Sequence, residues 1–152
     1  MKRYFILSIL LIAIVTFGKK KEQYVKILGA EDLTVYLDKA SIVQKGDDIY
    51  VWIMQTHIPP LNIESIKEKI YKSKTKYIFN PKINRYGILL IEYYNVKGDL
   101  IKKFDYSVKT NIPEYKYSYP IFEKSLEKKI LNTIFYYKPE LKKSIESGKK
   151  AE

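Results

Sequence analysis

Apolar and polar positions alternate along the first two thirds of the chain, the pattern of strands with one buried face. Stretches rich in β-branched and aromatic residues are separated by polar turn segments such as 45–48 and 95–99. This pattern predicts a meander of antiparallel strands. The expected strands are 24–28, 34–38, 41–43, 49–57, 74–79, 84–94, 100–108 and 115–119.

The last third of the chain changes to a helical period. Apolar residues four positions apart form one stripe, with charged residues outside it. The stripe consists of Phe122, Leu126, Ile130 and Ile134. We expect an amphipathic helix that begins near Pro120 or is capped by Ser125, ends before Pro139, and packs on one face of the sheet. The predicted fold class is therefore α+β, an antiparallel sheet with a C-terminal helix.

A shorter helical pattern interrupts the strands. Pro59 and Pro60 cannot donate to a strand ladder, so the preceding strand is expected to end there. Isoleucines at 63, 66 and 70 then repeat at helical spacing. We therefore expect a short helix or helical loop over 62–71.

The N-terminus has the layout of a secretory signal. Lys2 and Arg3 precede an apolar run over 4–17, which Gly18 ends. The run is shorter than the roughly 20 residues of a spanning helix, which favours cleavage after Gly18 over retention as an anchor. We expect a signal peptide over 1–18, a domain over 19–138, and a charged, disordered tail over 139–152. The mature protein would be exported, without a membrane anchor.

Composition adds two constraints to this outline. The chain has no cysteine, so its stability comes from packing without disulfides. The formal net charge is +11, and the lysines that dominate it are spread along the chain. A basic surface can attract nucleic acid, anionic lipid or sulfated glycans, but this distribution favours a solvated lysine-rich surface.

The sequence offers no recognisable catalytic set. His57 is the sole histidine, which excludes a multi-histidine metal site within one chain, and its apolar neighbours favour a surface position at a strand end. Neither a nucleophile elbow nor a glycine-rich phosphate loop is present. The acidic pairs at 31–32 and 47–48 lie in turn-like segments. We expect no enzymatic activity, no metal and no cofactor.

Two groups of aromatic residues are candidate binding elements. Alternation would place Tyr115, Tyr117 and Tyr119 on one face of a strand, where they could stack on sugars or dock a protein loop. The competing interpretation is structural, with this face packed on the final helix. Trp52, the sole tryptophan, is expected to be largely buried, the alternative being an exposed binding anchor.

The order of these elements resembles that of the surface-adhesin protein E-like family over residues 33–137. The shared features are Val35-Tyr36-Leu37-Asp38 with Ile42, the turn at Gly46, Val51-Trp52, Lys74-Thr75-Lys76-Tyr77-Ile78-Phe79, Arg85-Tyr86, Tyr93-Tyr94, Gly98-Asp99 and a proline-led final helix. The family commonly has a disulfide between a cysteine after the position of Phe79 and one at the end of the final helix. Asn80 and Tyr136-Tyr137 occupy these places, so the chain resembles a cysteine-free variant.

The resemblance implies a function as well as a fold. It implies an antiparallel sheet with a C-terminal helix, displayed at the bacterial surface, that binds host matrix or plasma proteins. The expected partner is a protein or glycan ligand at the cell exterior. The alternative is a structural or accessory protein that stays in the periplasm and binds another envelope component.

Overall fold

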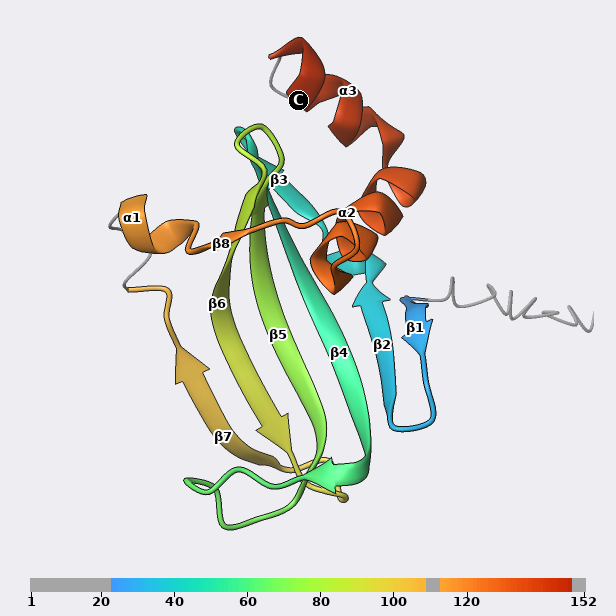
Figure 1. Cartoon of the computed structure of the whole chain (residues 1–152), viewed down its shortest axis with the longest axis vertical. Helices are drawn as coiled ribbons and strands as arrows, with labels where there is room; N and C mark the ends of the chain where they lie inside the picture. The colour runs from blue at the N-terminus through green and yellow to red at the C-terminus, as the bar shows by residue number, and fades with distance from the viewer. Residues whose placement is uncertain (1–22, 109–112, 149–152) are drawn as a thin grey trace, which may run out of the picture.

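The computed structural model describes residues 23–108 and 113–148, which form one antiparallel sheet with helices toward the C-terminus (Figure 1). The strands are β1 (Tyr24–Gly29), β2 (Leu33–Asp38), β3 (Val43–Lys45), β4 (Asp48–Leu61), β5 (Ile70–Asn80), β6 (Arg85–Tyr94), β7 (Leu100–Asp105) and β8 (Tyr119–Pro120). The helices are a 3₁₀ turn (Lys39–Ser41), α1 (Pro113–Lys116), α2 (Leu126–Tyr137) and α3 (Pro139–Ser147). The signal expected over 1–18 lies outside the described residues.

The sheet follows the chain almost strand by strand. Its order is β1-β2-β4-β5-β6-β7, with β3 added beside β4 and β8 beside β6, and every pair is antiparallel. The predicted α+β class, with an antiparallel meander and a C-terminal helix, is confirmed. Strands of this kind give the sheet two chemically different faces, because successive side chains point to opposite sides.

The core lies between one face of the sheet and α2, and we call this side of the sheet the helix face. α2 crosses the sheet in front of β4, with α3 continuing beyond it (Figure 1). α2 contributes Ile130 and Ile134, both fully buried. The core residues of the sheet are Val35, Leu37, Ile49, Val51, Ile53, Tyr77 and Phe79. Leu126 packs against the same core, so the part of the apolar stripe that lies within α2 packs on the sheet as predicted.

The start of α2 is fixed by a side-chain cap. Ser125 Oγ accepts a hydrogen bond from the Lys128 backbone N–H at 3.1 Å, which satisfies one of the unpaired amides of the first turn. The helix ends at Tyr137, before Pro139, as predicted. Phe122 differs from the expectation: it precedes the cap, lies outside the helix, and is 67% exposed.

The expected helix over 62–71 is wrong. β4 continues through both prolines to Leu61, which pairs with Ile70 of β5, and residues 62–69 form an irregular connection. The ladder is irregular between Thr56 and Leu61, so the prolines fall where no regular pairing requires their missing N–H groups. Ile66 and Ile70 are both buried, but they do not belong to a helix.

The disordered tail expected over 139–152 is also wrong for its described part, because residues 139–147 form α3. Pro139 occupies the start of the helix, and Gly148 ends it with a φ of 65°, a left-handed conformation that glycine adopts without strain. Leu141 is only 6% exposed, and Ile145 packs beside it against the core. Two apolar residues four positions apart are enough to dock this short helix.

Leu141→Ala should reduce the free energy of unfolding by about 2 to 3 kcal/mol, because it removes buried methyl groups at the edge of the core. Urea denaturation measures the change. Lys143→Ala is the matched control, an exposed position on the same helix, and should stay within about 0.5 kcal/mol. If Leu141→Ala changed the free energy of unfolding as little as Lys143→Ala, α3 would not contribute to the core.

Candidate functional site

The face of the sheet opposite α2, which we call the open face, carries aromatic side chains and lysines. Strand register places Trp52 opposite Lys76 and Met54 opposite Lys74, all on this face. In the part of the chain that the structure describes, the segment around α1 approaches it at one end, where the Lys116 carbonyl oxygen lies against Gly87. The rest of the face carries aromatic rings and lysines that are partly exposed.

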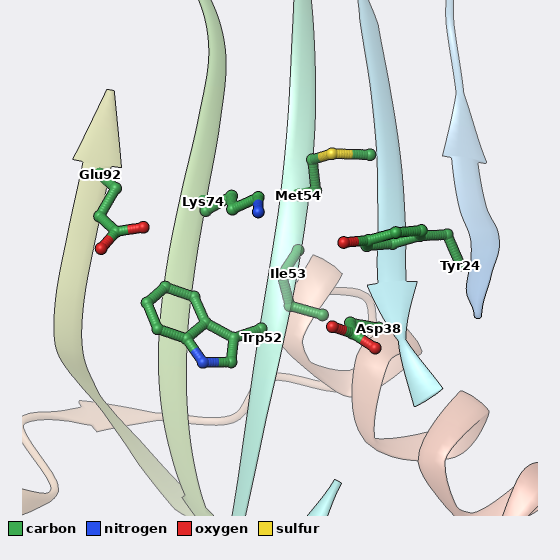
Figure 2. Close-up of a pocket in the computed structure, with 7 residues that line it drawn as sticks. All are labelled: Tyr24, Asp38, Trp52, Ile53, Met54, Lys74 and Glu92. Carbon is green, nitrogen blue, oxygen red and sulfur yellow. The ribbon is translucent and has the colours of Figure 1, made fainter. Parts of the chain in front are cut away.

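A depression of about 190 Å³ lies near the middle of this face (Figure 2). The residues around it come from five strands, so distant parts of the sequence meet here. They are Tyr24 of β1, Asp38 of β2, Trp52, Ile53 and Met54 of β4, Lys74 of β5 and Glu92 of β6. In Figure 2 the Trp52 indole extends over β5 and the Tyr24 ring reaches across β2 toward Met54. The site combines aromatic surface with two carboxylates and one ammonium group.

Hydrogen bonds hold both carboxylates of the depression in place. Tyr94 Oη donates to Glu92 at 2.7 Å, and Lys103 lies 4.0 Å away on the other side. Burial, followed by the hydrogen bond to Glu92, raises the pKa of Tyr94 to about 12. Asp38 accepts from the Gln23 side-chain amide at 3.1 Å and from the Ala40 N–H at 3.0 Å. Each carboxylate keeps further lone pairs for a ligand hydroxyl or amine.

Three lysines of β5 lie in a row beside these groups. Lys72 Nζ is 4.7 Å from the centroid of the Tyr94 ring, and Lys74 Nζ is 5.7 Å from the same ring. Lys76 Nζ lies 5.9 Å from the Trp52 ring. These are cation–π distances, at which an aromatic face attracts an ammonium group. The rings therefore hold the lysines close to the sheet.

Trp52 is not part of the hydrophobic core. Its side chain is partly buried and lies on the open face, while its neighbours Val51 and Ile53 point into the core. The expectation of a largely buried tryptophan is met only in part: Trp52 is partly buried, but on the open face rather than in the core. Trp52 is also not among the exposed aromatic residues of the described domain, so the alternative of an exposed binding anchor stays a prediction.

The three tyrosines expected on one strand face do not share one. Tyr115 lies in α1 and is 59% exposed, Tyr117 follows that helix, and Tyr119 lies in the two-residue strand β8. The ring of Tyr119, itself 48% exposed, packs against Tyr86 with 5.3 Å between centroids. The expected strand over 115–119 is thus mostly absent. A binding role for these tyrosines stays a prediction.

Tyr117 takes part in a buried polar cluster instead. Its hydroxyl lies 2.5 Å from Asp48, a carboxylate that is 7% exposed and also pairs with Lys116 Nζ at 2.7 Å. Asn80 Nδ2 donates to the same carboxylate at 3.0 Å. The hydrogen bond to Asp48 is the main cause that raises the pKa of Lys116 above its ordinary value. This cluster fastens the chain after α1 to the ends of β4 and β5.

His57 is buried rather than at the surface, which corrects the expectation. The residue is 7% exposed, and its Nε2 lies 3.0 Å from Ser73 Oγ on the neighbouring strand β5. Within residues 23–108 and 113–148, no group of three or more histidine, aspartate or glutamate side chains could hold a metal ion. No helix in these ranges is long and apolar enough to cross a membrane.

Sequence analysis missed the open-face site. The lysine row was visible as a period of two at Lys72, Lys74 and Lys76, because alternate residues of a strand share a face. Tyr24, Asp38 and Glu92 give no such signal, because only the register of β1, β2 and β6 brings them together.

Comparison with known proteins gives one result. The model of a family described as Surface-adhesin protein E matches residues 24–134, from the start of β1 into the last turn of α2. No curated protein and no solved structure gives a match.

The stability of the domain should depend on the protonation of His57. Burial lowers the pKa of His57 below its ordinary value of 6.5. Below pH 6.5 the unfolded chain therefore binds a proton more readily than the folded chain, and stability falls as the pH decreases. Proton NMR can follow the titration of this sole histidine directly. We expect a midpoint below 6.5 in the folded protein and an ordinary midpoint in urea, and a folded midpoint at or above 6.5 would contradict this assignment.

Proposed function

The chain belongs to the surface-adhesin protein E family, and on this basis we propose that it is an exported, non-enzymatic adhesin that binds extracellular ligands through its open face. The ligands would include host matrix or plasma proteins. Recognition would centre on the depression around Trp52, with Tyr24 and Tyr94 beside it. The proposal combines the family with the geometry of the described domain.

The observation that carries this proposal is the unequal covering of the sheet. α2 and α3 cover the helix face, whereas partly exposed aromatic rings from β1, β4 and β6 lie on the other side. Exposed aromatic surface is costly in water and is typical of binding sites. Tryptophan and tyrosine also supply large contact areas with little loss of side-chain entropy on binding.

The tyrosines at 115 and 119 offer a second exposed aromatic surface, near α1 and β8. They remain an alternative contact region for the same function. Tyr117 is less suited to contact a ligand, because its hydroxyl is engaged by Asp48. Substitutions in the two regions can therefore be compared directly.

Trp52→Ala should weaken binding to matrix or plasma proteins by about ten-fold or more, the effect of truncating an aromatic anchor at the centre of an interface. Binding of the purified mature domain to an array of such proteins, at physiological salt, measures the effect. Tyr136→Ala is the matched control, because Tyr136 is 78% exposed on the solvent side of α2. It should leave binding unchanged.

The double variant Tyr115→Ala/Tyr119→Ala tests the alternative surface in the same array. A loss of binding in this variant, with Trp52→Ala unaffected, would assign the function to the α1 region instead. Binding that none of these variants alters would contradict an aromatic contact surface. Thermal melting of each variant shows whether it is folded.

Protease treatment of intact cells should digest the domain, because an adhesin must be displayed at the outside. Immunoblotting of the full chain measures the digestion, with a periplasmic enzyme as the control for leakage. Protection until the outer membrane is opened would support the alternative, an accessory protein of the periplasm.

A further inference from the structure

The lysine row on β5 has a regular geometry. Alternate residues of a strand are about 6.8 Å apart, so the backbone positions of Lys72, Lys74 and Lys76 extend over about 14 Å along one line. All three side chains are partly buried, with their stems against the sheet. The row passes directly beside the depression, because Lys74 is one of its lining residues.

Within the described residues, no carboxylate forms an ion pair with the lysines of this row. Ion pairs are formed instead by Lys82, Lys103, Lys116, Lys128 and Lys142. The register places Glu92 opposite Lys74, but the carboxylate interacts with Tyr94 and Lys103. Each of the three ammonium groups lies at cation–π distance from an aromatic ring. Three aligned cations of this kind match a ligand with repeated negative charges.

The groups beside the row favour a carbohydrate as the ligand. Asp38 and Glu92 offer oriented acceptors for hydroxyl groups. Trp52 and Tyr24 offer aromatic surface against which the apolar face of a sugar ring can pack. Cations in a row, with acceptors and rings alongside, fit a chain that carries both negative groups and hydroxyls.

We propose that Lys72, Lys74 and Lys76 bind a linear sulfated polysaccharide, with one sugar of the chain seated in the depression beside Trp52. The negative groups of the polysaccharide contact the three ammonium groups, and its hydroxyls donate to Asp38 and Glu92. This inference names the ligand class of the open face and so rests on the proposed function. According to this inference, the domain binds a matrix component through the glycan that the component carries.

The test compares two variants with the same loss of charge. K72Q/K74Q/K76Q removes the row, and K124Q/K129Q/K143Q removes three exposed lysines around α2 and α3. Each is titrated at about 150 mM salt, where long-range attraction is screened. The probes are a heparin oligosaccharide of defined length, the same oligosaccharide after desulfation, and a single-stranded polynucleotide of equal charge. Thermal melting confirms that the variants are folded.

We expect the row variant to weaken heparin binding by about ten-fold or more and the control variant by less than about two-fold, because only contacting cations release bound counterions. Desulfation should remove most of the affinity of the wild-type domain. Equal losses in the two variants, or no loss in either, would overturn the proposal. Equal affinity for the polynucleotide would overturn the assignment to a glycan.

A second measurement uses the unmodified chain and does not depend on the folding of a variant. Trp52 is the sole tryptophan and lies beside Lys76, so its fluorescence reports on the proposed site. Heparin oligosaccharide should change this fluorescence with a saturating, one-to-one titration. Binding without any fluorescence change would place the polysaccharide elsewhere and overturn the proposal.

The two proposals can fail separately. Matrix binding that depends on Trp52 but is insensitive to competing heparin oligosaccharide would overturn the glycan inference and leave the adhesin function intact. Heparin binding through the row, in a domain that protease cannot reach on intact cells, would overturn surface adhesion while supporting the polysaccharide site.

Discussion

The packing of Ile130 and Ile134 against one face of the sheet determines most of the other features of this domain. Each such side chain contributes about 1.5 to 3 kcal/mol on burial, before the cost of ordering the chain. A slip of one residue in any central strand would exchange its two sets of side chains, taking Val51 and Phe79 away from α2. The helix thereby fixes the register of the strands. The same register determines which side chains remain on the opposite face.

The family resemblance implies a disulfide between the end of β5 and the end of the final helix. In this chain, polar contacts are found at both of these places. Asn80, at the place where the resemblance implies a cysteine, donates to the buried Asp48 carboxylate. At the end of α2, Lys138 Nζ donates to the Ile42 carbonyl at 2.9 Å, and Lys39 lies 4.9 Å from the Tyr137 ring. These contacts join the helix end to the segment between β2 and β3 rather than to the end of β5. The end of α2 is thus held by apolar packing together with these polar contacts, without a covalent bond.

The meander and α2 could be predicted because their periods of two and four extend over many residues. Short signals were less reliable. The spacing of Ile63, Ile66 and Ile70 suits a helix, but the same residues are accommodated by an irregular connection closed by strand pairing. α3 was missed because a docked helix of nine residues needs only two apolar contacts, and its composition is otherwise that of a solvated tail.

For the candidate site, prediction from the sequence was limited by tertiary structure rather than by short signals. Alternation places Trp52 and Lys76 on the same side of their strands, but the side that stays uncovered depends on where α2 packs. The depression needs five strands in register, which no local pattern encodes. Sequence reasoning therefore identifies candidate side chains one strand at a time, and the tertiary structure selects the set that acts together.

The edge of the open face is determined by a missing side chain. A Cβ at Gly87 would collide with the Lys116 carbonyl oxygen and lie 3.3 Å from Ile78, so only glycine lets the α1 segment settle here. Any larger residue would lift this segment, expose Ile78 and strain the Asp48 contacts that fasten it. The accessible area of the open face would then increase, although the residues around the depression would be unchanged. Position 87 thus controls how much of the open face the α1 segment covers.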